Sequence, residues 1–365
     1  MAKRERVLSA MSGGVDSSVA TLLLRDAGYE VAGATMRLFG NEVLPDGAES
    51  SCCSLSDVED ARQVAFGLGL EHFTFNFTDV FEHEVMDRFC DAYLHGRTPN
   101  PCIDCNRYLK FAALQRRRAQ LGYDYVATGH YARRVYDGAS GRYRLLRGLD
   151  PAKDQSYVLY HLTQDDLAHM LFPLGELTKA RVREIAAEHA FGNAEKAESQ
   201  DICFVPDGDY VAFIERYLAF RTLSGAEAFC SGDIVDCGGK VLGRHRGLIH
   251  YTIGQRKGIG VAAPEPLYVL AKDAARNELV VGLRHELGVT EVRANDVNLI
   301  SVAQIDAPLR VQAKTHYRQT AQPAWAAMDG DELVVTFDEP VARPAAGQAL
   351  VLYDGDAVVG GGTIR

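Results

Sequence analysis

A glycine- and serine-rich loop near the N-terminus has the residues needed to hold a phosphate group. Residues 10–18, Ala-Met-Ser-Gly-Gly-Val-Asp-Ser-Ser, follow a short apolar run and open a segment of helical periodicity. Glycines let the backbone approach an anion closely, and N–H groups at a helix N-terminus point towards it. The loop lacks the Gly-Lys-Ser/Thr of the Walker pattern. We predict a phosphate site in which Asp16 helps to hold a magnesium ion.

Two cysteine-containing segments are the second group of candidate residues. Cys102 and Cys105 lie in a proline-stiffened loop between two predicted helices, and Cys203 lies in an apolar setting much later in the chain. We expect Cys105 at or near a helix N-terminus, where the helix dipole favours the thiolate that attacks or binds metal. A zinc ribbon needs a second matching pair of cysteines, which the sequence lacks. Half-buried structural cysteines remain an alternative.

The elements that position these residues predict an α/β fold. Strand-like and helix-like segments alternate up to about residue 205, which is typical of a parallel sheet with helices on both faces. Ligands of such sheets bind beyond the carboxyl ends of the strands. Short β-type runs follow, and from residue 289 helix signals vanish. We predict a catalytic domain at 1–205, a small mixed central domain at 206–288 and an antiparallel β-barrel at 289–365.

Composition limits the classes of protein to consider. The chain has 365 residues and a net charge of −10, with no apolar run long enough to span a membrane. We expect a cytoplasmic protein, in which structural disulfides are unusual. The acidic balance argues against a general affinity for polyanions. One basic stretch is a candidate nucleic-acid face, although a solvated helix face is the simpler interpretation: Arg97, Arg107, Lys110 and Arg116–Arg118.

The loop sequence Ser-Gly-Gly-Val-Asp-Ser resembles the pyrophosphate loop (PP-loop) of the ATP-pyrophosphatase superfamily. The resemblance implies a fold like that of the adenine nucleotide alpha hydrolases, with ATP and Mg²⁺ as cofactors. Members cleave ATP between the α and β phosphates and adenylate a carbonyl oxygen. The superfamily contains small-molecule ligases as well as tRNA-modifying enzymes, so the loop predicts adenylation and leaves the acceptor open.

Further motifs make the resemblance closer. They are Thr-Pro-Asn-Pro at 98–101 with Cys-Asn-Arg at 105–107, Ala-Thr-Gly-His-Tyr-Ala at 127–132, Lys-Asp-Gln-Ser-Tyr at 153–157, Ser-Gln-Asp-Ile-Cys-Phe at 199–204 and Tyr-Thr-Ile-Gly-Gln-Arg-Lys-Gly at 251–258. Together they look like the bacterial tRNA 2-thiouridylase family, over nearly the whole chain. The resemblance implies ATP-dependent 2-thiolation of the wobble uridine, with the central domain contributing to tRNA binding.

The resemblance also implies roles for individual residues. Cys105 is the nucleophile and Cys203 carries the persulfide sulfur. The residues in contact with ATP are Ala10, Met11, Ser12, Gly13, Gly14, Val15, Asp16, Ser17, Met36 and Gly129. The target base lies against Asn100, Pro101 and Cys102, and the other tRNA contacts are His130, Lys153, Asp154, Gln155, His316, Tyr317 and Gln348. A buried, hydrogen-bonded histidine is the alternative for His130.

One position departs from the commonest form of the family motif. An aspartate, often assigned as general acid/base, usually stands where this chain has Cys102, and Asp104 is two residues further on. The aspartate's role therefore cannot be transferred. Cys102 opens a second route, in which Cys102, Cys105 and Cys203 bind three irons of a [4Fe–4S] cluster and the fourth iron carries sulfide.

The same resemblance implies partners. These are tRNAs for Lys, Glu and Gln and a sulfur donor such as a cysteine desulfurase or a persulfide relay protein, and we expect the protein to be a monomer. Two other classes of function compete with this interpretation. A small-molecule ATP-dependent ligase would leave the cysteine pair and the barrel unexplained. A non-catalytic RNA-binding or redox-sensing protein would not need the intact loop.

Overall fold

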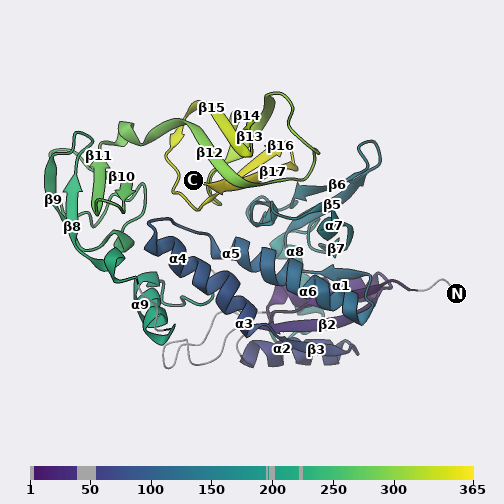
Figure 1. Cartoon of the computed structure of the whole chain (residues 1–365). Coiled ribbons are helices and arrows are strands. Elements are labelled where there is room, and N and C mark those ends of the chain that lie inside the picture. The colour runs from purple at the N-terminus through teal and green to yellow at the C-terminus, as the bar shows by residue number, and fades with distance from the viewer. Residues whose placement is uncertain (1–3, 39–54, 195, 197–201, 222–224) are drawn as a thin grey trace.

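The N-terminal half is built on a five-stranded parallel sheet. The computed structural model describes residues 4–38, 55–194, 196, 202–221 and 225–365 (Figure 1). The sheet has the order β3-β2-β1-β4-β7. Its strands are β1 (Arg6–Ala10), β2 (Glu30–Arg37), β3 (His72–Asn76), β4 (Tyr125–Ala127) and β7 (Met170–Leu171). Five of the six residues of β2 from Val31 to Met36 have apolar or glycine side chains and all six are buried, as expected for a strand covered on both faces.

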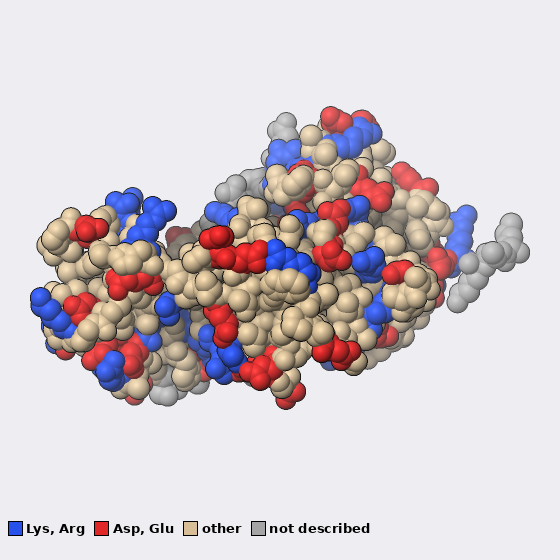
Figure 2. Space-filling view, turned by 90° about the horizontal axis from the view of Figure 1, so that it is seen from above, with Lys and Arg blue, Asp and Glu red and all other residues tan. Residues whose placement is uncertain are grey.

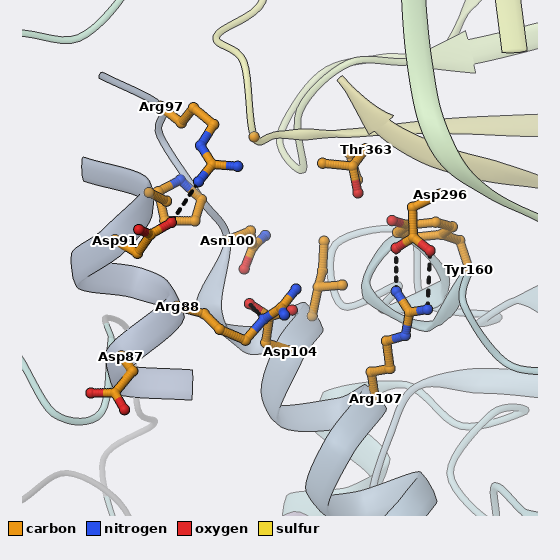
Figure 3. A pocket seen from close by; sticks show the side chains of 15 residues that line it. Asp87, Arg88, Asp91, Arg97, Asn100, Asp104, Arg107, Tyr160, Asp296 and Thr363 are labelled. Carbon is orange, nitrogen blue, oxygen red and sulfur yellow. Dashed lines mark hydrogen bonds and ion pairs between the residues drawn. The ribbon is translucent and has the colours of Figure 1, made fainter. Parts of the chain in front are cut away.

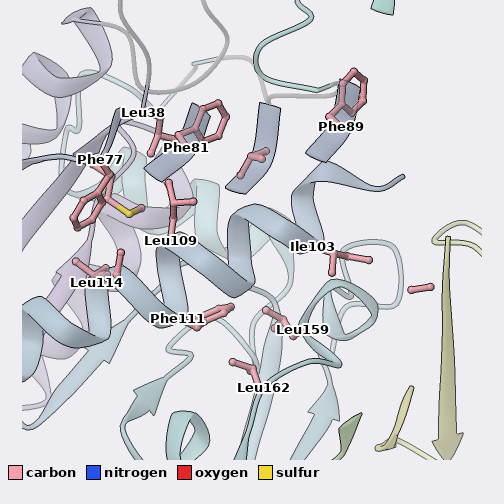
Figure 4. Close-up of a cluster of buried hydrophobic side chains, with 14 of the residues drawn as sticks. Leu38, Phe77, Phe81, Phe89, Ile103, Leu109, Phe111, Leu114, Leu159 and Leu162 are labelled. Atoms are coloured by element: carbon pink, nitrogen blue, oxygen red, sulfur yellow. The ribbon is translucent and has the colours of Figure 1, made fainter. Parts of the chain in front are cut away.

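Helices cover both faces of this sheet. On one face α1 (Val15–Asp26) packs against α8 (Lys179–Glu188) and lies beside α2 (Leu55–Gly67). The other face is covered by two helical stretches that each combine α-helical and π-helical segments. The first comprises α3 (Thr78–Phe81), η1 (Glu82–Asp87) and α4 (Arg88–Leu94), and the second comprises α5 (Pro101–Asp104), η2 (Cys105–Ala113) and α6 (Leu114–Leu121). Their apolar side chains, including Phe81, Phe89, Leu109 and Leu114, form the largest core (Figure 4).

A small mixed sheet follows α9 (Tyr210–Arg221) and lies at a distance from the parallel sheet (Figure 1). The order is β10-β11-β8-β9. Its strands are β8 (Gly232–Val235), β9 (Val241–His245), β10 (Tyr268–Asp273) and β11 (Glu278–Gly282), which overlap the β-type runs expected from the sequence. Ile234, Val269, Leu279 and Val281 form a separate core for this sheet.

Six antiparallel strands near the C-terminus close into a barrel. The order is β12-β15-β14-β13-β16-β17, and β17 pairs with β12 to complete the ring. The strands are β12 (Gly288–Leu299), β13 (Leu309–Lys314), β14 (Gln322–Asp329), β15 (Glu332–Ala342), β16 (Ala349–Asp354) and β17 (Ala357–Ile364). Alternating residues such as Val311, Ala313, Val335 and Phe337 fill its interior. The predicted fold class, a PP-loop α/β domain followed by a mixed domain and an antiparallel barrel, is confirmed.

A hairpin joins the first and last parts of the chain. Strands β5 (Ala132–Asp137) and β6 (Arg142–Arg147) extend the barrel's sheet beyond β17, where Leu146 is the partner of Ala357. Barrel residues such as Tyr353 and Val358 also belong to the same core as the helices from α3 to α6. The sequence did not predict this hairpin. Among the described residues, none of the helices is both long and apolar enough to cross a membrane.

Candidate active site

The predicted phosphate loop lies at the carboxyl end of β1, where it connects directly to α1. Gly13 has a positive φ of 74°. A Cβ atom added there would lie 2.4 Å from the carbonyl oxygen of Asp57, so only glycine fits between the loop and α2. Gly14 is the N-cap residue of α1 and contributes no side chain to its first turn. The first turn of α1 therefore retains backbone N–H groups suited to an anion.

Hydroxyl groups hold the loop in shape. The Ser12 N–H donates to Ser17 Oγ at 3.1 Å, and the Ser17 and Ser18 hydroxyls donate to the Gly14 carbonyl at 3.0 and 3.1 Å. These bonds fix the turn without using the N–H groups at the start of α1. The loop is thus pre-organised for a ligand, because its conformation is set by its own side chains.

Asp16 lies at the centre of a charged network in the first turn of α1. Lys179 at the start of α8 donates to both carboxylate oxygens, at 2.7 and 2.8 Å, and the Tyr131 hydroxyl donates to one of them at 2.7 Å. Lys179 is only 8% exposed. A buried ammonium beside a phosphate loop can neutralise charge that develops on a leaving pyrophosphate. Oxygen ligands such as the Asp16 carboxylate also suit Mg²⁺.

Two residues that follow α8 hold the phosphate loop and the neighbouring helix α2. Asn193 Nδ2 donates to the Gly13 carbonyl at 2.9 Å and to Ser18 Oγ at 3.0 Å, and Asn193 is buried. Lys196 Nζ bridges Asp57 and Asp60 of α2 at 2.6 Å each. Lys179 and Asn193 therefore contact the loop and the first turn of α1, and Lys196 holds the start of α2, against which Gly13 lies.

The other predicted ATP contacts lie along the same edge of the sheet. Gly129 follows β4, and a Cβ atom there would be 3.0 Å from the backbone of Asp16 and of Ser17. Met36 lies near the end of β2, and its side chain is buried in the main core. Thr35 donates its hydroxyl to the Met11 carbonyl at 2.8 Å. The structure thus brings Gly129 to the loop, and the whole set lies at the carboxyl ends of adjacent strands.

The predicted nucleophile lies in the second turn of its helix. Asn100 caps α5 by accepting from the Cys102 N–H at 3.2 Å, and Pro101 takes the first helical position. Cys105 then begins the π-helix η2. Cys105 thus lies one turn after the helix start at Pro101, which agrees with its expected position at or near a helix N-terminus. The helix dipole acts mainly within the first turn, which contains Cys102.

Cys203 is held by the aromatic residue that follows it. Phe204 is buried and packs edge-on against Phe81 and Phe89, with ring centroids 5.7 and 5.2 Å apart. Cys105 and Cys203 are both half-buried and both pack against the same main core. Residues 199–201 of the Cys203 motif lie outside the described residues.

The iron–sulfur interpretation finds no matching arrangement in this structure. Cys102, Cys105 and Cys203 are all described, and the described part of the chain contains no group of three or more His, Cys, Asp or Glu residues able to hold a metal ion. A [4Fe–4S] cluster needs its cysteine ligands gathered around one centre. The residues in this conformation do not fit the cluster.

Several of the predicted tRNA contacts meet where the N-terminal α/β part of the chain touches the barrel. Tyr317 donates its hydroxyl to the Asp154 carbonyl at 3.1 Å. The pKa of Tyr317 is raised, chiefly by burial and further by the nearby charges of Asp154 and Cys102. Gln348 donates to the Thr98 carbonyl at 2.7 Å. These contacts connect residues far apart in sequence with the loop that carries Cys102.

The remaining predicted tRNA contacts differ in their surroundings. His316 is exposed beside Tyr317, and Lys153 is half-buried. Gln155 accepts from the Tyr131 N–H at 3.0 Å, which connects it to the residue that binds Asp16. His130 is 8% exposed, and its Nδ1 pairs with Thr128 Oγ1 at 2.8 Å. Burial lowers its pKa well below the ordinary value, so the ring is neutral. These features match the alternative of a buried, hydrogen-bonded histidine.

At least three of the six basic residues considered as a nucleic-acid face make contacts within the protein. Arg97 pairs with Asp91 at 2.7 Å, and Arg107 binds Asp296 of the barrel through both guanidinium nitrogens. Arg118 donates to the carbonyls of Tyr123 and Asp124. Figure 2 shows basic and acidic side chains interspersed on the face seen from above. These arginines therefore act mainly in structural contacts.

A pocket of about 360 Å³ opens beside the cysteine loop (Figure 3). Its walls come from α4, from the loop and helix that follow, and from the barrel. Asn100 and Asp104 lie on one side, and Tyr160 and Asp296 lie on the other. Burial raises the pKa of Asp104 to about 6, although Arg88 opposes the shift. Asp104 therefore brings to the pocket wall a carboxyl group that binds a proton more readily than an ordinary aspartate does.

Sequence reasoning missed Lys179, Asn193 and Lys196 as parts of the site. Lys179 follows a helix-capping Thr178 in an ordinary amphipathic segment, and Asn193 lies in a loop. No local motif marks them, because only the fold brings them to the phosphate loop. Tyr131 belongs to the Ala-Thr-Gly-His-Tyr-Ala motif, so its neighbourhood was recognised although its role was not.

Three family models match successive parts of the chain. A model described as a tRNA methyl transferase HUP domain matches residues 5–207, a tRNA methyl transferase PRC-barrel domain matches 213–283, and an aminomethyltransferase beta-barrel domain matches 289–364. A solved complex of a 4-thiouridine synthetase with RNA and ATP is 18% identical, with a TM-score of 0.38 over 59% of this chain and 50% of that one.

Curated relatives match over nearly the full length. The tRNA-specific 2-thiouridylase MnmA of Moorella thermoacetica is 50% identical over 98% of both chains. The protein of the same name from Heliobacterium modesticaldum is 49% identical over 99% of this chain and 92% of its own. With this identity and coverage, together with a family model that spans the PP-loop domain, the chain belongs to the family of the tRNA-specific 2-thiouridylases.

Proposed function

We propose that the protein uses ATP to replace the 2-oxygen of a tRNA uridine, at the wobble position, with sulfur. The observation that carries the proposal is the pre-organised phosphate loop, with Lys179 on Asp16, in a chain that shares the family's cysteine motifs. The 2-thiouridylase names of relatives at 44–50% identity support tRNA as the substrate.

The first chemical step is adenylation of the uridine. The base must leave the helical stack for its O2 atom to reach ATP. O2 attacks the α-phosphorus and the bond to the β-phosphate oxygen breaks, so pyrophosphate leaves. The N–H groups at the start of α1 and the ammonium of Lys179 stabilise the charge on that leaving group. Asp16 is the residue that would hold Mg²⁺, which offsets phosphate charge when bound.

The second step is sulfur transfer, for which we propose the persulfide route. A sulfur donor first leaves a terminal sulfur on Cys203. That sulfur attacks C2, the Cys105 thiolate attacks Cys203 Sγ, and the sulfur–sulfur bond of the persulfide breaks. AMP leaves with the former O2. The two electrons that reduce the sulfur come from the two thiols, which end as a disulfide between Cys105 and Cys203 and need an external thiol for the next cycle.

The test is direct detection of the product. Purified protein is incubated without oxygen with ATP, Mg²⁺, unmodified tRNA, an external thiol and a donor of persulfide sulfur, such as a cysteine desulfurase with free cysteine, and the digested tRNA is examined by mass spectrometry. We expect 2-thiouridine and tRNA-dependent pyrophosphate release. Pyrophosphate release that ignores tRNA, with no 2-thiouridine from any sulfur source, would instead support a small-molecule ligase.

Three variants separate the two sulfur routes. Loss of thiolation in Cys105→Ala and Cys203→Ala, with activity kept in Cys102→Ala, supports the persulfide route. Loss in all three variants, accompanied by loss of bound iron, supports the [4Fe–4S] route with Cys102, Cys105 and Cys203 as ligands. Transfer RNAs for Lys, Glu and Gln are the first substrates to compare, and a cysteine desulfurase or persulfide relay protein is the class of donor to supply.

A further inference from the structure

The pocket beside the cysteine loop has a charge balance that disfavours phosphate. Four carboxylates line it, those of Asp87, Asp91, Asp104 and Asp296. The lining arginines each lie against one of these acids. Arg97 pairs with Asp91 at 2.7 Å, Arg88 lies 3.6 Å from Asp104, and Arg107 binds Asp296. The lining therefore has four carboxylates against three guanidinium groups, and this excess of negative charge disfavours an anion, so the pocket suits an uncharged, polar ligand.

The remaining wall atoms suit a flat heterocycle. Pro99 provides apolar surface, and the partly exposed guanidinium groups of the three lining arginines provide planar faces, whereas Ile103, Ala349 and Tyr160 are buried in the pocket wall. Asn100, Asp104 and Thr363 provide hydrogen-bonding groups between these faces. Proteins recognise unstacked RNA bases in this way, by stacking on rings or guanidinium planes and by hydrogen bonds to base edges. A volume of about 360 Å³ is at the small end of ligand sites.

The position of the pocket links it to the target uridine. Asn100, expected to contact the target base, lines the pocket, and Gln348, expected to contact tRNA, follows the lining residue Gly347. Flipping the target base removes a stacking partner from its neighbours in the loop. A pocket next to the flipped base can replace that stacking for one neighbour.

We infer that this pocket binds the base of one of the two nucleotides that flank the target uridine. The inference rests on the proposed tRNA function and specifies which part of the RNA the protein holds besides the reacting base. A base held in the pocket gives the RNA strand a second fixed point, next to the target uridine that lies against Asn100. It would therefore contribute to substrate choice without taking part in the chemistry.

The test uses anticodon stem-loop RNAs in which 2-aminopurine replaces either neighbour of the target uridine, or a more distant loop base. We expect the fluorescence of one neighbour to change on binding, whereas the distant base stays constant. Thr363→Phe fills the pocket from β17 and should weaken binding about tenfold, the size of one lost stacking contact. Thr336→Phe, the same substitution on the exposed side of β15, is the control and should bind as wild type.

An RNA with an abasic nucleotide beside the target uridine lacks one base but keeps its phosphate. It therefore distinguishes binding of the base from binding of the phosphate, and it can be tested with the wild-type protein. If the pocket holds the base, an abasic neighbour should weaken binding to wild type by the same factor as Thr363→Phe, and the two changes together should cost no more than either one. Equal affinity for abasic and parent RNA, or an unchanged signal in Thr363→Phe, would overturn the inference. Fluorescence changes without formation of 2-thiouridine would support base binding in the pocket and contradict the proposed function. Formation of 2-thiouridine with no fluorescence change at either neighbour would support the proposed function and contradict base binding in the pocket.

Discussion

Lys179 is the residue whose role depends most on its surroundings. Its ammonium is buried and touches both oxygens of Asp16, so removing it leaves a carboxylate without its main counter-charge. We expect Lys179→Met to lower the free energy of unfolding by about 2–3 kcal/mol and to slow pyrophosphate release roughly tenfold or more. Chemical denaturation and a pyrophosphate assay measure the two effects.

Arg181 provides the control, since it lies two residues later on α8 and pairs with exposed Glu184 and Glu188. Arg181→Met should change neither measurement. A Lys179→Met enzyme that releases pyrophosphate at the wild-type rate would show that the ammonium only stabilises the fold.

Asp104 gives a pH-dependent prediction. Burial raises the pKa of its carboxyl from the ordinary 3.8 to about 6, so the folded protein binds this proton more tightly than the unfolded chain does. Its contribution to stability therefore falls as the pH rises from about 4 to about 6. Asp104→Asn removes this loss and should be more stable than wild type at pH 7 by about 1–2 kcal/mol.

Thermal unfolding at a series of pH values checks the sign for Asp104. The difference in Tm between Asp104→Asn and wild type should grow between pH 4 and pH 6 and then level off. A variant that is less stable than wild type at pH 7 would mean that the contact with Arg88, at 3.6 Å, outweighs the burial of the charge.

At the scale of elements, the turn between β1 and α1 depends on Gly13. Its φ is 74°, and a Cβ atom there would lie 2.4 Å from the Asp57 carbonyl oxygen. Gly13→Ala should displace the turn from α2 and abolish measurable ATP binding in calorimetry, with a conformational cost of about 1–2 kcal/mol. Gly28 also has a positive φ but has open space around it. Gly28→Ala should therefore lose stability yet bind ATP normally, and equal ATP affinity in both variants would contradict this account.

Elements whose character is set locally were predictable from the sequence. Strands β1 and β2 are largely apolar runs, and the phosphate loop follows the first of them with its glycines in place. The hairpin β5–β6 was missed because its strands are rich in arginine and depend on distant partners. The Arg142 guanidinium donates to the carbonyls of Leu299 and Ile300, and Leu146 pairs with Ala357.

The residues of the candidate site also fall into two groups, those that the local sequence predicts and those that only the fold brings to the site. The glycines and serines of residues 12–18 act on their own backbone, so their pattern in sequence predicts their role. Lys179 and Asn193 act on that backbone from far along the chain, and ordinary helix and loop sequence surrounds them. The π-helical form of η2 was likewise unpredicted, because this rare helix type depends on packing around it.

At the scale of the whole molecule, an ion pair connects the helix that carries Cys105, the proposed nucleophile, to the barrel. Arg107 lies two residues after Cys105 and binds Asp296, whose φ of 51° at an irregularity in β12 directs it towards the helix. We expect Asp296→Asn to reduce thiolation about tenfold relative to pyrophosphate release, because Cys105 is less well placed while the phosphate loop is unaffected. The ratio of 2-thiouridine to pyrophosphate measures this change.

Asp338→Asn is the matched control, because Asp338 forms a similar paired contact with Arg310 within the barrel. This variant should keep the wild-type ratio. Exchanging the charges in Arg107→Asp with Asp296→Arg should restore part of the loss. If Asp296→Asn lowers both products equally, the pair only holds the domains together.

The pairing of β6 with β17 also has a consequence for how the protein is made. Ala357 leaves the ribosome about 210 residues after its partner Leu146, which at bacterial rates is roughly 10–40 s later. Until then one edge of the hairpin and the part of the main core completed by Tyr353 and Val358 have no cover. The nascent chain therefore cannot complete this core until the last barrel strands have emerged, and a fragment ending before the barrel would be an aggregation-prone substrate for chaperones rather than a smaller enzyme.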